Sequence, residues 1–308
     1  QMRDAVKSGY ATFVLDTTEA GFNASPTLHD ALAQVNFGHV AVHRTAEVSK
    51  AIIRAYYGAD PEFSYFVGGS RGGGQGMMAS QRYPEDFDGI VAGAPAFNWT
   101  GLAATQLRIV QTLYPDPNVL DKTILSKEEV ERLSAEIMLQ CDEQDGLKDG
   151  IISDPFNLQF SLDDITWLSD AQRNAVQAIY DGARNQDGHI YPGYPIGSEA
   201  DWFEWQVGPV DKWPVPTESP VPTAGYFFCD SVFKYLVFND PDWDYSTLDF
   251  ATYAKDTRLA AATLDAVDTD VSAFRDRGGK IIFWHGLADA GLSAIATLAY
   301  YKPLIDRG

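Results

Sequence analysis

The chain has 308 residues, of which 45% are hydrophobic, enough to bury a substantial core. Lysine and arginine number 23 against 43 aspartates and glutamates, so the formal net charge at pH 7 is −20. A charge of this sign argues against nucleic acid or an anionic membrane as partner and suits a protein that works among divalent cations. No apolar run in the sequence is long enough to span a bilayer. The length favours one fold that carries a large insertion.

Strand and helix patterns alternate in the first part of the chain. They predict a buried strand over residues 10–15, an amphipathic helix over 45–57, a strand over 65–68, a helix over 73–82 and a strand over 90–93. Because strands that alternate with helices build a parallel sheet, we predict an α/β fold.

The pattern changes in the middle of the chain. From about Phe97 to about Ala266 there are few strand signals. Acidic loops, tryptophans and proline-rich segments such as residues 213–220 take their place. Regular α/β character returns with a helix that ends near residue 277, a strand over 280–284 and a helix over 293–301. We interpret the irregular part as a lid inserted into the sheet fold.

These boundaries predict three parts of the chain. Residues 1–97 form the first part of the catalytic core, residues 98–266 form the lid, and residues 267–308 form the second part of the core.

A serine flanked by glycines, Ser70, stands between the strand that ends at residue 68 and the helix that follows. This layout is that of a nucleophile elbow, a turn so sharp that its central residue is strained and its neighbours must be tiny. Gly68 and Gly72 meet that requirement, and the amide of Arg71, at the start of the new helix, would point toward a developing oxyanion. The alternative is a glycine-rich turn with an incidental serine.

The residues after the elbow resemble one family. The helix that ends in Arg82-Tyr83-Pro84 and the strand over residues 89–96, Gly-Ile-Val-Ala-Gly-Ala-Pro-Ala, are similar to those of the tannase and feruloyl esterase family. This family of secreted serine esterases also contains mono(hydroxyethyl) terephthalate hydrolases. The resemblance extends over nearly the whole chain and implies an α/β-hydrolase fold with a large lid.

The acid of the triad is predicted to be Asp289. In an α/β hydrolase the triad runs serine, acid, histidine along the chain, and the strand over residues 280–284 delivers Asp289 to the sheet edge. The alternative is a solvated loop aspartate.

The resemblance places the catalytic histidine well beyond the acid, and none of the five histidines fills that role convincingly. They are His29, His39, His43, His189 and His285. The family's upstream oxyanion contributor is also not found, and we therefore expect a sequence truncated at both ends.

The acidic run after residue 141 is a candidate calcium loop. Its carboxylates are close in sequence, but spacing alone leaves a solvated acidic turn equally open. The resemblance implies that a structural calcium ion is held by the carboxylates of Asp142, Asp145 and Asp149 and by the carbonyl groups of Leu147 and Ile151. No cluster of histidine or cysteine ligands indicates a catalytic metal.

Two cysteines, Cys141 and Cys229, allow one disulfide and demand none. Many members of the family that the chain resembles have a cysteine directly before the nucleophile, bonded to one directly after the catalytic histidine. Here that position is Gly69, so this covalent link cannot form.

The predicted lid is rich in aromatic side chains, which suit a phenolic acyl group by stacking, although packing within the lid explains each one singly. They are Trp167, Tyr191, Tyr194, Trp202, Phe203, Trp205, Trp213, Tyr226, Phe227 and Phe228. The resemblance implies a small aromatic ester as substrate, free or attached to plant cell-wall polysaccharide, and a secreted or periplasmic protein. Feruloyl esterase is preferred over tannase and terephthalate half-ester hydrolase. The rival from another class is a non-catalytic binder of phenolic material.

Overall fold

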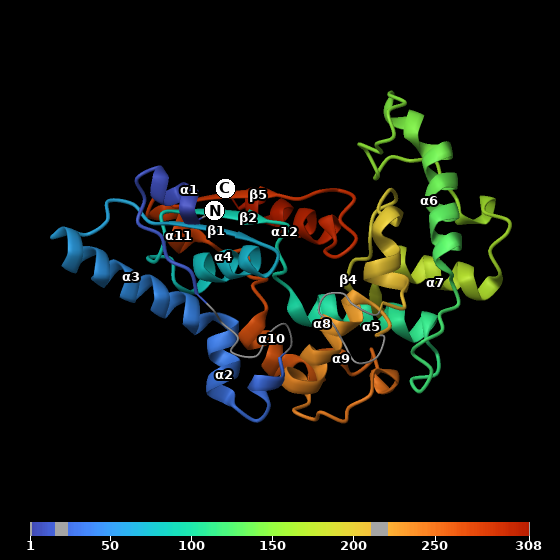
Figure 1. Cartoon of the computed structure of the whole chain (residues 1–308), viewed down its shortest axis with the longest axis horizontal. Coiled ribbons are helices and arrows are strands. Elements are labelled where there is room, and N and C mark those ends of the chain that lie inside the picture. Colours follow the sequence, from blue (N-terminus) through green and yellow to red (C-terminus); the bar gives the residue numbers. More distant parts are fainter. Residues whose placement is uncertain (1, 16–23, 211–220, 308) are drawn as a thin grey trace.

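The computed structural model describes residues 2–15, 24–210 and 221–307. A small parallel sheet lies toward one side of the molecule with helices α4 (Arg71–Arg82), α11 (Ser272–Asp276) and α12 (Ala294–Asp306). Helices α6 (Lys127–Cys141) and α7 (Asp170–Asp181) lie at the opposite end of the long axis (Figure 1). No helix in the described part of the chain is both long and apolar enough to cross a membrane.

The sheet consists of three parallel strands, β1 (Tyr65–Gly69), β2 (Gly89–Gly93) and β5 (Lys280–Trp284), in the order β1-β2-β5. In the register of the sheet, Gly69, Gly93 and Trp284 lie side by side at its carboxyl edge. Two strands from one end of the sequence and one from the other therefore meet at this edge, and the α/β prediction is confirmed.

The two faces of the sheet differ. On one face, helices α4 (Arg71–Arg82) and α12 (Ala294–Asp306) pack against Phe66, Ile90 and Phe283. The other face carries Tyr65, Val67, Ile282 and Trp284, each more than half exposed in the described structure. Alternation along each strand produces this difference, because successive side chains point to opposite faces.

Helix α4 approaches the sheet closely because it is rich in glycine. A Cβ atom on Gly74 would overlap the carbonyl oxygen of Ala96, and one on Gly76 would press on Ile90. The approach holds the start of the helix directly below the carboxyl edge of the sheet.

The described residues 98–210 and 221–266 form a mostly helical body built around α5 (Trp99–Leu113), a helix that is buried along nearly its whole length. Helix α5 packs most closely against α8 (Ala224–Val232) and α7 (Asp170–Asp181). A hydrophobic pattern all round a helix is typical of a central position in a core.

The remaining elements of this body are shorter or lie farther out. They are α6 (Lys127–Cys141), η3 (Asp142–Asp145), η4 (Leu162–Asp164), β3 (Ala183–Asn185), β4 (Gly188–Tyr191), η5 (Glu199–Asp201), η6 (Phe203–Val207), η7 (Phe233–Val237), η8 (Tyr245–Thr247), α9 (Tyr253–Asp256) and α10 (Arg258–Leu264). Strands β3 and β4 form an antiparallel hairpin that the sequence patterns did not predict.

Outside this body, the elements other than the sheet, α4 and α12 are α1 (Met2–Lys7), η1 (Ser25–Thr27), α2 (Ala31–Val35), η2 (Asn36–Val40), α3 (Ala41–Tyr57) and α11 (Ser272–Asp276). Most predicted elements are confirmed, with α3 starting at Ala41 and α12 running to Asp306, beyond their predicted ends.

The strand predicted over residues 10–15 is wrong, since residues 11–15 form no strand. A strand needs a neighbour to bond with, and the described sheet ends at β1. The proline-rich stretch, Trp213 included, lies outside the described residues.

The helical body leaves and rejoins the sheet at one place, which we call the neck (residues 97–100 and 264–266). The amide of Ala266 donates to the carbonyl oxygen of Phe97 at 2.7 Å, and the Asp265 carboxylate accepts bonds from the amide and hydroxyl of Thr100. Burial raises the pKa of Asp265 to about 6, despite these bonds. Hydrogen bonds thus join the two segments of the neck.

We predict that Gly74→Ala lowers the free energy of unfolding by about 1–3 kcal/mol, because the added methyl group overlaps the backbone at Ala96. Gly72→Ala is the matched control in the same helix, since open space surrounds its Cβ position. That variant should be neutral or more stable by about 0.5–1 kcal/mol. Urea unfolding measures both, and equal destabilisation would contradict the packing described for α4.

Candidate active site

Ser70 is the single residue between β1 and α4, and its backbone is left-handed, with φ 57° and ψ −123°. Its amide donates to the carbonyl oxygen of Gly93 at 2.9 Å, and its carbonyl oxygen accepts from the amide of Ala96 at 2.9 Å. Few residues other than glycine adopt such a φ, and the strain persists only where the surroundings impose it. The predicted elbow geometry is therefore present, with the serine exposed at the carboxyl edge of the sheet.

The glycines beside Ser70 have unequal roles. A Cβ atom on Gly68 would overlap the backbone of Gly72, which explains why this position must be glycine. A Cβ atom on Gly72 would meet nothing within 4 Å, so the expectation of a collision at both positions is wrong for Gly72.

Arg71 opens helix α4, so its amide belongs to the first turn, whose amides have no acceptor within the helix. These amides and the helix dipole favour negative charge near Ser70. The local chemistry suits an oxyanion.

Asp289 lies five residues after the end of β5, at the same edge of the sheet as Ser70. Its Oδ1 accepts hydrogen bonds of 2.9 Å from the amides of Gly291 and Leu292, and its Oδ2 lies 3.4 Å from Nε2 of His285. Burial alone would raise the pKa of Asp289, but the bonds from His285 and the two amides outweigh burial and lower the pKa below its ordinary value. The group is a fixed carboxylate at neutral pH.

Side chains of the helical body contact the loop after Asp289 and hold it in place. The Tyr194 hydroxyl donates to the carbonyl oxygen of Gly291 at 3.1 Å, and the Gln206 amide donates to that of Ala290 at 2.5 Å. Trp205 packs so closely on Gly291 that a Cβ atom there would lie 3.0 Å from the indole. The position of the carboxylate thus depends on Tyr194, Trp205 and Gln206 of the helical body as well as on β5.

The described histidines make other contacts. His39 bonds to Tyr83 at 2.6 Å, His43 bonds to Asp86 at 2.9 Å, and His285 bonds through its two nitrogens to Thr297 and the carbonyl oxygen of Leu292. Among the hydrogen bonds of the described residues, none joins a histidine to Ser70. The geometry assigns no resident histidine as the base.

The acidic loop folds back on Asp142, which is 7% exposed and accepts bonds from the amides of Asp149 and Gly150. The Asp145 carboxylate accepts from the amides of Leu147 and Ser153. Within residues 2–15, 24–210 and 221–307, no group of three or more histidine, cysteine or acidic side chains is arranged to hold a metal. Carboxylate oxygens are donors that suit calcium, but in this arrangement the carboxylates of Asp142 and Asp145 accept hydrogen bonds from backbone amides instead. The calcium loop stays a prediction.

Cys141 and Cys229 are both buried and free. Burial raises the pKa of each thiol, so both are protonated and unreactive at neutral pH.

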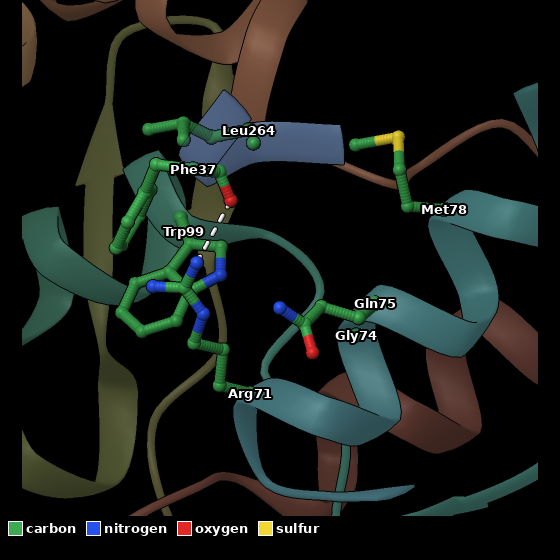
Figure 2. Close-up of a pocket in the computed structure, with 8 residues that line it drawn as sticks. Phe37, Arg71, Gly74, Gln75, Met78, Trp99 and Leu264 are labelled. Atoms are coloured by element: carbon green, nitrogen blue, oxygen red, sulfur yellow. Dashed lines mark hydrogen bonds between the residues drawn. The ribbon is translucent and has the colours of Figure 1, made fainter. Parts of the chain in front are cut away.

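The side chain of Arg71 is a feature that the sequence did not reveal. Its Nη2 donates to the carbonyl oxygen of Phe37 at 2.8 Å, and its guanidinium carbon lies 3.4 Å from the centre of the Phe37 ring (Figure 2). The two residues are 34 positions apart, and no spacing rule connects them.

Comparison with known proteins places this geometry in a class. The fold is that of an α/β hydrolase, and a crystal structure of feruloyl esterase B from Aspergillus oryzae superposes with a TM-score of 0.84 at 29% identity, covering 99% of this chain and 60% of that one. Tannin acyl hydrolase from Aspergillus niger, at 22% identity and a TM-score of 0.67, shares the fold over 89% of this chain and 53% of its own.

The family model for tannase and feruloyl esterase matches residues 1–307, and the chain belongs to that family. A probable feruloyl esterase B-1 from Aspergillus fumigatus is 31% identical over 314 residues, covering 98% of this chain and 56% of the relative. The chain spans little more than half the length of the curated relatives that it matches.

The lowered pKa of Asp289 predicts a pH-dependent effect of Asp289→Asn on stability. A carboxyl group with a depressed folded-state pKa stabilises the fold above its ordinary pKa and loses this contribution as the pH falls through the folded value. The parent should therefore exceed the variant in stability most at pH 7, and the difference should shrink toward pH 3. Urea unfolding at both pH values measures it.

The exposed Asp306, at the end of α12, provides the control. Asp306→Asn should change stability little at either pH. A difference for Asp289→Asn that is the same at pH 3 and pH 7 would contradict the bonding described for this carboxylate.

Proposed function

We propose that the protein is a serine carboxylic-ester hydrolase that acts on esters of phenolic acids, with feruloyl esterase as the preferred activity. The observation that carries the proposal is the strained elbow at Ser70, which shares a sheet edge with the fixed carboxylate of Asp289. Membership of the tannase and feruloyl esterase family supports this chemistry.

In the proposed mechanism, the Ser70 Oγ attacks the ester carbonyl carbon while its proton passes to a histidine base. The Arg71 amide donates to the resulting oxyanion, and Asp289 orients the histidine and stabilises its charged form. Collapse of the tetrahedral intermediate breaks the ester bond, and the alcohol leaves with the proton from the histidine. Water then attacks the acyl-serine by the same steps and releases the acid.

The helical body supplies aromatic side chains beside the proposed acid, and we propose that it acts as a lid. Trp205 rests on Gly291, two residues from Asp289, and its ring stacks with that of Phe228 at 6.3 Å and 21°. Trp202, Tyr191 and Tyr194 are buried, so these three serve packing within the body. An aromatic surface next to the acid supports a phenolic acyl group as substrate.

The names of the relatives favour ferulate over gallate. The curated relatives near 30% identity are called probable feruloyl esterases, whereas the tannin acyl hydrolase, at 22% identity, shares only the fold. We also propose that the protein acts outside the cytoplasm, on small aromatic esters that are free or attached to plant cell-wall polysaccharide. Support for this location comes from the family resemblance.

The full-length protein should hydrolyse methyl ferulate and react with a fluorophosphonate probe at Ser70. Ser70→Ala should remove the label and lower kcat by about 10⁴- to 10⁶-fold, because the nucleophile is lost. Ser80→Ala is the matched control, since the Ser80 hydroxyl donates to the carbonyl oxygen of Met77 in the preceding turn of the same helix.

Equal labelling of the parent and Ser70→Ala would remove Ser70 from the mechanism. A parent that binds ferulate but neither reacts with the probe nor hydrolyses the ester would favour the rival, a non-catalytic binder of phenolic compounds.

We further propose that a structural calcium ion binds the loop of residues 142–151 and that Asp142, Asp145, Asp149 and the carbonyl groups of Leu147 and Ile151 hold it. The hard oxygen donors and the resemblance to the family support this proposal, and binding would require the carboxylates to exchange amide donors for the ion. Its role would be to hold the loop at the end of α6.

Chelation should lower the melting temperature of the calcium-loaded parent and leave that of Asp145→Ala nearly unchanged, because a ligand bound only by the folded state raises apparent stability. Asp163→Ala, at an exposed carboxylate outside the loop, should respond to chelator as the parent does. If chelator has no effect on a calcium-loaded parent, the loop is an ordinary acidic turn.

A further inference from the structure

The side chain next to the proposed nucleophile is partly buried, and its partners are unusual for an arginine. Arg71 stacks on the Phe37 ring and donates from Nη2 to the Phe37 carbonyl oxygen, while its Nε is buried and has no hydrogen-bond partner among the described residues. No ion pair of the described residues includes Arg71, although the chain carries 43 acidic side chains.

A partly buried cation without a carboxylate carries a cost, since burial removes hydration that only pairing or hydrogen bonding replaces. Burial lowers the pKa of Arg71 to about 10, so the guanidinium still carries its charge at neutral pH. The Phe37 ring and carbonyl group therefore provide its main compensation, through a cation–π contact and a charge-assisted hydrogen bond.

A small cavity of about 10 Å³, room for one water molecule, lies beside the guanidinium. Figure 2 shows the Gln75 amide turned toward Arg71 across this space. The surroundings are otherwise apolar, with Met78, Trp99 and Leu264 in the lining. The guanidinium is thus held on Phe37 by the ring stack and the hydrogen bond.

The anchor for Arg71 is itself fixed to the neck. A Cβ atom on Gly38 would overlap the carbonyl oxygen of Thr263, so η2 packs directly on the end of α10. The Phe37 ring also meets Trp99, at the start of α5, edge to face at 6.5 Å. Arg71 consequently joins the elbow to the two places where the helical body leaves and rejoins the sheet.

We propose that the Arg71 side chain is a positioning residue, which clamps the elbow to Phe37 and the neck and thereby fixes the Arg71 amide for the oxyanion. The proposal rests on the proposed esterase function. Its physical basis is that the Arg71 amide and side chain share one Cα atom, directly after the strained Ser70, so a side chain locked by two contacts restricts the direction of the amide. A hydrogen-bond donor acts on an oxyanion only when it is preorganised.

The test uses the full-length protein with the variants Arg71→Lys and Arg71→Met. Lysine keeps the charge without the planar stack, and methionine fills space without the charge. For methyl ferulate we expect kcat to fall by about 10- to 100-fold, a part of the loss known for a deleted oxyanion donor, and KM to change by less than about threefold.

Binding of an oxyanion mimic separates positioning from stability. An aryl trifluoromethyl ketone, which forms a tetrahedral adduct with the serine, should bind more weakly by about the factor lost in kcat. The affinity for ferulate, which forms no adduct, should stay within about threefold of that of the parent.

Arg82→Lys is the matched control. Arg82 ends the same helix and donates to the carbonyl oxygen of Ala262 in α10, but it lies away from the elbow. This variant should lower the melting temperature without changing kcat or the affinity for the ketone. Phe37→Leu provides a second route, because it removes the ring and leaves the carbonyl acceptor, and it should show a smaller loss of kcat than Arg71→Met.

The outcomes separate the two proposals. If both Arg71 variants and Phe37→Leu keep kcat and ketone affinity within threefold of the parent while Ser70→Ala is inactive, the positioning role is wrong and the esterase function stands. If the parent is as inactive as Ser70→Ala, both proposals fail, because no oxyanion forms for Arg71 to stabilise.

Discussion

The site depends on one constraint, the left-handed backbone of Ser70 at the junction of β1 and α4. Two hydrogen bonds, to Gly93 and from Ala96, hold this residue against the chain that leaves β2. The glycines of α4 allow the helix to start directly below the sheet edge, and Gly68 removes the side chain that would block the turn. Strain at one residue is thus maintained by close packing on both sides of it.

The elements that complete the site come from distant parts of the sequence. The acid follows β5, a strand that pairs with β2 although the whole helical body separates the two in sequence. That body also holds the acid loop through Tyr194 and Gln206. The neck, with Ala266 bonded to Phe97, fixes where the body sits. The sheet, the neck and the helical body therefore together determine where Asp289 lies relative to Ser70.

The elbow, the helices α3, α4, α11 and α12, and the strand before Asp289 could be predicted because their signals are local. These signals are glycine spacing and apolar periodicity within about a dozen residues. Features that join residues far apart in the sequence could not be predicted. The strand predicted over residues 10–15 lacked a partner, and neither the Arg71 contact with Phe37 nor the bonds from Tyr194 to the acid loop leaves a pattern in the sequence. Gly72 shows the limit of motif reasoning, since its own Cβ position is open.

The most direct test of the account is a crystal structure of the full-length protein after reaction with an aryl phosphonate. We expect phosphorus bonded to Ser70 Oγ, a phosphoryl oxygen within about 3 Å of the Arg71 amide nitrogen, and an imidazole between the serine and Asp289. A phosphoryl oxygen turned away from Arg71, or an adduct on another residue, would contradict the account.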